Sequence, residues 1–294
     1  MIGFTRGSFF SSARVLLTAA LGVVVGGQAA RADLTAYDSF SYTPGTALAG
    51  QNGGTGFSGA WAPGSLSSDG SNSYYTQGTS LGGSTSAGGR VASLANYSLG
   101  NQLSRTLSQS LGGTDQTVYI SVLLRPDGTL NEGSSGGFFG LNLNASTTTA
   151  STDNDVFIGK TSGSNYGIED RGGNNSHLTS TAAAIGVSTL LVVRADLAAN
   201  GNDKFTLYVN PTATSQGPAT VKYDSNVGTI SSLSIYGTGA FSLDELRIGT
   251  TLADVVPAGT TIGAVPEPAS IAMLSIAGLG VAALARARRR PATA

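Results

Sequence analysis

Short segments in which every second residue is apolar constrain the fold of this chain most strongly. Residues 116–124 show the pattern clearly, because Val118, Ile120, Val122 and Leu124 share one parity. Successive side chains of a β-strand point to opposite faces of the sheet, so this period places one face in a core. Residues 116–124 are therefore predicted to form a core strand.

The alternation recurs through the middle of the chain. Further strands are predicted at 138–144, 155–161, 188–197, 204–210, 231–236 and 241–249, with weaker ones at 36–41, 91–97, 102–107, 166–170 and 222–224. Asn200 and Gly201 tolerate positive φ angles, so the two segments that flank them are expected to form a hairpin. The segments 231–236 and 241–249 are expected to pair with each other around Gly237 and Gly239.

No segment between residues 33 and 265 combines helical periodicity with caps. Short strands separated by turn signals are typical of an all-β sandwich. Glycine makes up 42 of 294 residues, about twice the average share of ~7%, which suits either many tight turns or disorder. The apolar alternation favours the folded sandwich, with long loops among residues 34–111.

The N-terminus has the three parts of a secretory signal peptide. Two arginines precede the uncharged apolar run 15–25, and the small residues Ala30 and Ala32 follow it. A buried helix or an uncleaved anchor is the alternative, but the run is shorter than the ~20 residues of a spanning helix. Cleavage is predicted between Ala32 and Asp33, with the secretory translocase and signal peptidase as partners.

An uncharged segment near the C-terminus predicts a short membrane helix. Residues 269–285 would reach roughly 25 Å as an α-helix, slightly less than the ~30 Å hydrocarbon thickness of a bilayer. Four arginines follow the segment and resist translocation, so they are expected in the cytoplasm and the body outside it. These arginines are Arg286, Arg288, Arg289 and Arg290.

Pro266, Glu267 and Pro268, followed by a short apolar segment and an arginine cluster, resemble the PEP-CTERM sorting signal. The resemblance implies that an exosortase, a membrane transpeptidase, recognises these three residues and removes the tail. It also implies transient anchoring in the inner membrane, then delivery to the cell surface or extracellular matrix. The alternative is a plain anchor that stays in the membrane.

The two ends leave a body with its own composition. The predicted division is a signal peptide at 1–32, a β-sandwich at 33–256, a linker at 257–264, a sorting segment at 265–290 with its helix at 269–285, and a cytoplasmic tail at 291–294. Residues 33–265 hold 16 acidic and nine basic residues, a net charge of −7. This charge argues against nucleic acid as a partner. The chain has no cysteine, so disulfides and thiolate chemistry are excluded.

Three stretches resemble framework segments of concanavalin A-like, laminin-G-like jelly rolls. They are 37–40 (Tyr-Asp-Ser-Phe), 52–61 and 241–251. The resemblance implies that the first strand lies close to the last. Some members of the group bind glycans or proteins, but the matching stretches identify no ligand residues here.

Catalytic motifs are weak in this sequence. Residues 54–59 satisfy G-x-G-x-x-G but lack the expected strand and helix around them, and 78–82 and 133–137 match G-x-S-x-G without an α/β sheet. His177, the single histidine, is expected in a loop. Trp61, the single tryptophan, is expected to anchor the core, or else to form a sugar platform.

Paired acids would be needed for glycoside hydrolysis. Asp244 with Glu245 and Glu169 with Asp170 are adjacent in the sequence, and neighbours on a strand point to opposite faces. These four residues are expected to face solvent or cap turns, and no catalytic residue is assigned.

Asp153, Asn154 and Asp155 bring three oxygen-bearing side chains together before a strand. Ca²⁺ takes six to eight oxygen ligands, so this segment is the candidate for a cation. Ordinary turn residues are the alternative, and no other cofactor is expected.

Three functions remain open. The first is a non-catalytic surface or matrix protein that adheres to exopolysaccharide or to neighbouring proteins. The second is an extracellular polysaccharide hydrolase or lyase on the same fold, and the third is a purely structural protein without a ligand. The glycan-binding residues, if any, are not identified by the sequence.

Overall fold

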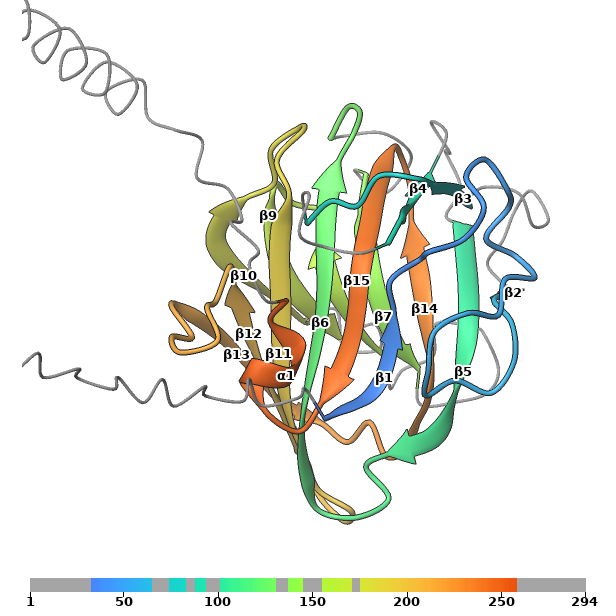
Figure 1. Cartoon of the computed structure of the whole chain (residues 1–294). Helices are drawn as coiled ribbons and strands as arrows, with labels where there is room; N and C mark the ends of the chain where they lie inside the picture. The colour runs from blue at the N-terminus through green and yellow to red at the C-terminus, as the bar shows by residue number, and fades with distance from the viewer. Residues whose placement is uncertain are drawn as a thin grey trace, which may run out of the picture. The chain divides into compact units, whose positions relative to one another are not determined.

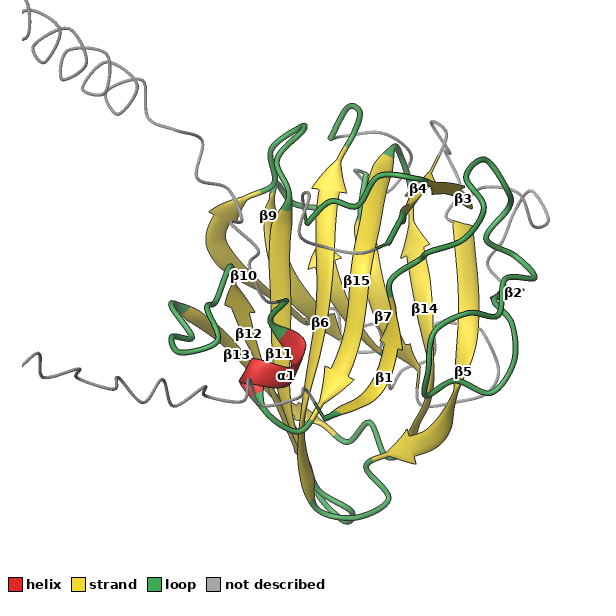
Figure 2. Ribbon diagram, viewed as in Figure 1, coloured by secondary structure: helices red, strands yellow, loops and turns green. Residues whose placement is uncertain are grey.

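The computed structural model describes residues 33–64, 74–82, 88–93, 101–130, 137–144, 155–170 and 175–257. These ranges lie in the second of two compact units of the chain, Ala32–Ala294. They form two antiparallel sheets packed face to face, and their only helix is α1 (Leu252–Val255) (Figures 1 and 2). The prediction of an all-β sandwich is therefore confirmed.

Eight strands make up the first sheet, sheet A. Their order is β13-β12-β11-β6-β15-β4-β3, and β1 pairs with β15 outside this path. The strands are β1 (Leu34–Asp38), β3 (Tyr74–Gln77), β4 (Arg90–Ser93), β6 (Gln116–Pro126), β11 (Thr189–Leu197), β12 (Asp203–Val209), β13 (Ala219–Ser225) and β15 (Phe241–Gly249).

Seven strands make up the second sheet, sheet B, in the order β10-β9-β8-β7-β14-β5-β2. The strands are β2 (Ala62–Pro63), β5 (Asn101–Leu111), β7 (Phe139–Asn144), β8 (Val156–Lys160), β9 (Asn165–Asp170), β10 (Asn175–Ala182) and β14 (Ile230–Gly237).

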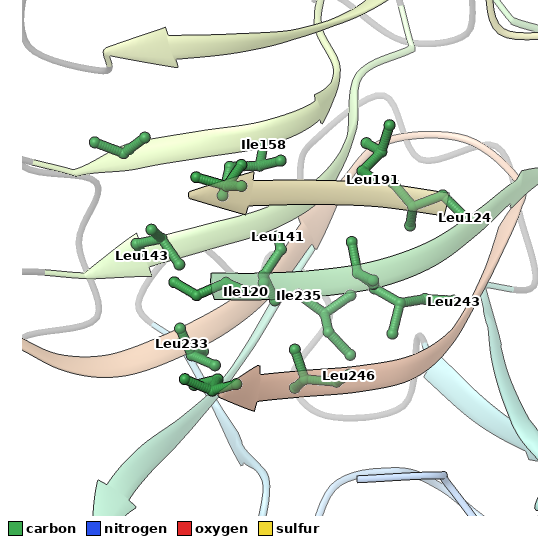
Figure 3. Close-up of a cluster of buried hydrophobic side chains, with 14 of the residues drawn as sticks. Ile120, Leu124, Leu141, Leu143, Ile158, Leu191, Leu233, Ile235, Leu243 and Leu246 are labelled. Carbon is green, nitrogen blue, oxygen red and sulfur yellow. The ribbon is translucent and has the colours of Figure 1, made fainter. Parts of the chain in front are cut away.

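The core lies between the two sheets and follows the predicted alternation. Ile120 and Leu124 of β6 are at most 2% exposed and belong to one buried cluster with Leu141 of β7 and Ile235 of β14 (Figure 3). Each fully buried side chain of this size contributes roughly 1.5–3 kcal/mol relative to its exposed state. Because the chain has no disulfide, this packing carries the stability of the sandwich.

One predicted strand pair is confirmed and another is wrong. β11 and β12 form the expected antiparallel hairpin, in which Val193 lies opposite Leu207. β14 and β15, by contrast, lie in different sheets: β14 pairs with β5 and β7, and β15 pairs with β1, β4 and β6. Residues 238–240 therefore connect the two sheets rather than closing a hairpin, and each strand contributes apolar side chains to the core from its own sheet.

The first strand pairs with the last, as the jelly-roll resemblance implies. β1 runs antiparallel to β15, with Leu34 opposite Gly249 and Asp38 opposite Leu246 (Figure 1). The first strand of the described body therefore lies beside its last strand in sheet A.

His177 lies in β10 rather than in a loop, which corrects the sequence-based expectation. β10 is the end strand of sheet B, and Leu178 is 48% exposed. The strand buries no apolar face, so it lacks the alternation by which the other strands are recognised. Long loops occur as expected in residues 39–61, where the described chain forms only isolated bridges.

No helix in the described ranges is long and apolar enough to cross a membrane. The predicted signal segment and the predicted helix at 269–285 lie outside the described residues.

Candidate functional site

The face of sheet B that points away from the core is polar. Leu141 and Leu143 of β7 face the core, so Asn142 and Asn144 point to the opposite side. In the register of the sheet, Ser234 of β14 lies opposite Asn142 on one side and Ser104 of β5 on the other, and Ser232 lies opposite Asn144. We call these residues the amide–hydroxyl ladder: Ser104, Asn142, Asn144, Ser232 and Ser234.

Hydrogen bonds connect the whole ladder. Asn144 Nδ2 donates to Ser234 Oγ (2.5 Å) and Ser232 Oγ (3.2 Å), and the hydroxyl groups of Ser234 and Ser104 lie 3.0 Å apart. Asn142 Nδ2 donates to Asn144 Oδ1 at 2.6 Å. All five side chains are at most 6% exposed. Among the described residues, Asn142 Oδ1 has no hydrogen-bond partner, so the ladder retains one buried acceptor.

Three aromatic rings lie next to the ladder on the same face. The ring of Phe138 meets Phe157 edge to face at 5.8 Å between centroids and Tyr236 at 4.8 Å. Phe157 lies opposite Asn142 in the register, and Tyr236 lies opposite Gly140. The face thus combines neutral donors and acceptors with aromatic rings, and Tyr236 is its half-buried member.

Glycines continue this face across β7, β8 and β9. Gly140, Gly159 and Gly167 lie opposite one another in consecutive strands. A Cβ atom on Gly140 would lie 2.1 Å from the carbonyl oxygen of Ile158, and one on Gly159 would lie 2.2 Å from that of Phe139. The strands therefore approach more closely here than side chains allow.

A buried ion pair supports the other end of sheet B. Arg105 Nη1 lies 2.7 Å from Asp38 Oδ2, and both side chains are 2% exposed. The same carboxyl oxygen accepts hydrogen bonds from Trp61 Nε1 (3.0 Å) and the Tyr42 hydroxyl (2.7 Å), and Asp38 Oδ1 accepts one from Phe40 N. These contacts satisfy the carboxylate fully, which a buried charge requires.

Arg105 also holds the loop that precedes β2. Its guanidinium donates to the carbonyl oxygens of Gly53 (2.7 Å) and Gly59 (3.0 Å) and lies 4.4 Å from the centre of the Phe57 ring. Trp61 is 1% exposed, so its predicted core position is confirmed. The stretches 37–40 and 52–61 thus meet at Arg105, in agreement with a framework role.

The glycine motif at 54–59 is a close-packed loop. Gly54 and Gly56 have φ angles of 77° and 79°, and a Cβ atom on Gly56 would lie 2.1 Å from the carbonyl oxygen of Thr35. The loop packs against β1 through the paired Tyr37 and Thr55 backbones and leads into β2. It lacks the following helix that a dinucleotide site needs, as expected.

Asp244 and Glu245 do not face solvent, which corrects the expectation from the sequence. Asp244 is 0% and Glu245 is 1% exposed. A β-bulge between Asp244 and Arg247 inserts an extra residue opposite β6, and Glu245 adopts a φ of 53° there. This irregularity breaks the simple alternation on which the expectation was based.

Each of these two acids has its own partners. Asp244 accepts hydrogen bonds from Ser80 Oγ (2.5 Å) and Leu81 N (2.8 Å), and Glu245 forms an ion pair with Arg247 at 2.6 Å. Burial, above all, raises the pKa of Asp244 to about 7, with a smaller contribution from the charge of Glu245. Ser80 belongs to the G-x-S-x-G match at 78–82, so that serine holds a loop against β15.

Only one member of the other acid pair, Glu169 with Asp170, has a described side chain. Glu169 of β9 is half-buried on the outer face of sheet B, opposite Phe157 and Ser176. The side chain of Asp170 lies outside what the structure describes.

Of the candidate calcium ligands, only Asp155 lies within the described residues. Its carboxylate is buried and accepts a hydrogen bond from Asn142 Nδ2 at 3.0 Å, so it joins the amide–hydroxyl ladder. Asp153 and Asn154 lie outside the described residues. In the described part of the chain, no three His, Cys, Asp or Glu side chains cluster as a metal site would require.

The processing residues lie mostly outside the described ranges as well. This holds for Ala30 and Ala32, for the sorting residues Pro266, Glu267 and Pro268, and for Arg286, Arg288, Arg289 and Arg290. Asp33, the residue after the predicted cleavage, is described, and its backbone nitrogen donates to Asp254 Oδ1 at 3.2 Å. No pattern in the sequence signals this contact or the ladder, because both join segments far apart in the chain.

Comparison with known proteins identifies the C-terminal segment. Residues 264–290 match the PEP-CTERM protein-sorting motif. The resemblance of this segment is therefore confirmed. The motif implies export, an exosortase as processing partner and sorting to the cell surface. No curated protein matches the chain significantly.

Several solved structures are similar to the body. An endo-β-1,4-glucuronan lyase from the fungus Trichoderma reesei matches 76% of this chain over 98% of its own, with 11% identity and a TM-score of 0.40. An alginate lyase from Corynebacterium sp. matches 56% of this chain over 78% of its own, with 10% identity and a TM-score of 0.38. Lectin I from Ulex europaeus, in complex with a fucose glycoside, matches 65% of this chain over 98% of its own, with 9% identity and a TM-score of 0.37.

Proposed function

We propose that this chain is an exported, non-catalytic surface or matrix protein whose body adheres to exopolysaccharide. The sorting motif at 264–290 carries the export half of the proposal. The outer face of sheet B supports the binding half, because the half-buried Tyr236 ring and the half-buried Glu169 carboxylate match the apolar ring faces and hydroxyl groups of a sugar.

Two side chains of this face are partly exposed and could contact a sugar. Tyr236 is a half-buried ring, and Glu169 is a half-buried carboxylate two strands away from Asn142 in the register. The ladder itself is buried, so a ligand would contact its border rather than its length.

Four acids of the body make contacts that support a non-catalytic role. Asp38 pairs with Arg105, and Asp203 accepts hydrogen bonds from Ala198 N (2.8 Å) and Val227 N (2.9 Å). Asp254 caps α1, and Glu245 pairs with Arg247. A carboxylate held in this way stabilises the fold and is not poised to transfer a proton to a substrate.

Binding is tested with the exported chain on an array of bacterial exopolysaccharides. We expect retention of at least one polysaccharide and a weaker signal for Tyr236→Phe, which keeps the ring and removes the hydroxyl group. Tyr119→Phe on sheet A is the matched control and should bind as the natural chain does. Absence of binding to every polysaccharide overturns the adhesive proposal.

A hydrolase or lyase is the second candidate, and one observation favours it. A carboxyl group with a pKa of about 7 is suited to act as a general acid, and Asp244 has this pKa, although its side chain is fully buried against Ser80 and Leu81. Incubation of the exported chain with the same polysaccharides, followed by assays for reducing ends and unsaturated uronates, separates the two candidates. Product formation that is lost in Asp244→Asn would replace the non-catalytic proposal.

A structural protein without a ligand is the third candidate. The internal hydrogen bonding of the ladder favours it, because a fully connected polar network also stabilises a sheet. Absence of binding to every polysaccharide, together with absence of reaction products, would select this candidate.

A further inference from the structure

The two ends of the described body are joined by a hydrogen bond across 221 residues. The backbone nitrogen of Asp33 donates to Asp254 Oδ1 at 3.2 Å. The next residue, Leu34, begins β1 opposite Gly249, the last residue of β15. The backbone nitrogen that would become the new N-terminus after the predicted cleavage thus lies beside the carboxylate of α1.

Asp254 is held in place by α1. Its Oδ2 accepts a hydrogen bond from Thr251 N (2.8 Å), while its own backbone nitrogen donates to Thr251 Oγ1 (3.3 Å), which forms a capping box. Burial alone would raise the pKa of Asp254, but hydrogen bonds from Thr251, Asp33 and Thr250 hold it below its ordinary value. The carboxylate is therefore ionised and fixed at neutral pH.

α1 is in turn fixed to sheet A. Val255 is fully buried and packs with Leu123 and Leu190 on the outer face of that sheet. Its carbonyl oxygen accepts a hydrogen bond from Ser121 Oγ at 2.7 Å. Figure 1 shows α1 lying across this face beside β11. The sorting motif begins at residue 264, so α1 is the last described element before it.

Cleavage between Ala32 and Asp33 changes the chemistry of the donor nitrogen. Hydrolysis places the hydroxyl group of water on the carbonyl carbon of Ala32 and its remaining proton on the nitrogen of Asp33. The new carboxyl group then loses a proton, and the new amine takes one up. An α-amino group has a pKa of about 7.7–8.0 and is mostly protonated at neutral pH.

We propose that removal of the signal peptide turns the Asp33–Asp254 hydrogen bond into an ion pair that locks the mature N-terminus onto α1. An ammonium group donates a stronger hydrogen bond to a carboxylate than an amide does. This ion pair joins β1 to α1, from which the chain continues toward the sorting motif. It forms only after the signal peptide has been removed. The inference rests on the proposed export.

The test uses the full chain, exported and processed by a host with a signal peptidase and purified in detergent. Mass spectrometry first identifies the N-terminal residue. The α-amine is then labelled at pH 7 with an amine-reactive ester, and the labelled N-terminal peptide is quantified over time. A pKa raised by one unit leaves about tenfold less neutral amine to react.

Two variants separate the ion pair from the fold. Asp254→Asn removes the carboxylate, and insertion of Gly and Ser between Ala32 and Asp33 moves the amine away while the capping box remains. We expect both to be labelled several-fold to about tenfold faster than the natural chain. The control is Asp115→Asn, which removes a carboxylate that accepts a hydrogen bond from Ala199 N. This variant should leave the labelling rate unchanged.

The outcomes are distinguishable. Equal labelling rates in all chains that begin at Asp33 overturn the proposed ion pair, while the export proposal stands. A first residue other than Asp33 in the processed natural chain overturns the predicted cleavage site and the proposed ion pair. A retained signal segment in a host that processes its own exported proteins contradicts the export proposal as well.

Discussion

Asp38 and Arg105 are 67 positions apart in the sequence, yet their side chains meet at 2.7 Å inside the sandwich. Arg105 comes from β5 of sheet B and Asp38 from the end of β1 of sheet A. The pair therefore joins the two sheets and also the loop 50–61, through Trp61 and Gly53.

Removal of one charge of this pair should destabilise the fold strongly. In Asp38→Asn the guanidinium of Arg105 stays buried without a carboxylate, which we expect to cost about 3–5 kcal/mol of unfolding free energy. Urea titration measures this change. Arg194→Ala breaks the pair with Asp196, whose side chains are 40% and 30% exposed, and serves as the control with a cost below about 1 kcal/mol. Equal costs for both variants would contradict the assignment.

Stability should fall as pH rises from about 4 to about 7 because of Asp244. Its pKa is raised to about 7 in the folded protein from 3.8. The folded state therefore binds more protons than the unfolded state in this window, and deprotonation of the buried carboxyl group opposes folding. The loss is at most about 4 kcal/mol. Urea titrations of the natural chain and of Asp244→Asn at several pH values isolate the contribution of Asp244. The unfolding free energy of the variant should lack this dependence on pH. A natural chain with the same pH profile as the variant would refute the prediction.

The in-register glycines of sheet B should not tolerate a methyl group. In Gly140→Ala the new Cβ atom would meet the Ile158 carbonyl oxygen at 2.1 Å, so strands β7 and β8 must separate. We expect a loss of about 1–3 kcal/mol or more by thermal unfolding. Gly113→Ala is the matched control, because nothing lies within 4 Å of its added Cβ atom and its φ is not positive. A natural melting temperature in Gly140→Ala would be incompatible with the close strand approach.

Trp61 should report on the framework by fluorescence. As the single tryptophan, fully buried against Phe40, it is expected to emit at a blue-shifted wavelength and to shift to the red on unfolding. Trp61→Phe removes the hydrogen bond to Asp38, and we expect a cost of about 1.5–3 kcal/mol because the acceptor is charged. Tyr42→Phe removes a second bond to the same oxygen and should show a similar cost. A red-shifted emission of the folded chain would contradict the buried position.

Calcium at residues 153–155 is tested by melting curves in the presence of calcium and of a chelator. We expect equal melting temperatures, because the carboxylate of Asp155 is already bonded to Asn142, and Asp and Asn are common in sequences that bind no ligand. A higher melting temperature in calcium that is lost in Asp153→Asn would instead establish the site. Glu132→Gln is an unrelated acid variant for comparison.

The core strands could be predicted because their signal is local. Val118, Ile120, Val122 and Leu124 reveal β6 whichever strands lie beside it, since alternation is a property of the extended backbone. β10 was missed because its exposed edge position does not require alternation. The pairing of β14 with β15 was wrong because proximity in the sequence says little about which neighbours bury the most surface.

The candidate site was less accessible to prediction than the fold. Asn142, Asn144 and Ser234 are ordinary polar residues in the sequence, and only the register of β5, β14 and β7 brings them together. Asp244 and Glu245 were misassigned to the surface because a β-bulge and the Ser80 loop bury them.

The sequence by itself determined the sorting motif, the strand periodicity and the absence of disulfides, because each depends on residues that are contiguous or on composition. The tertiary structure alone decided which strands are neighbours, which acids are buried, and that Asp33 lies beside Asp254. Those features depend on the free energy of packing between distant segments, and no local pattern in the chain encodes that balance.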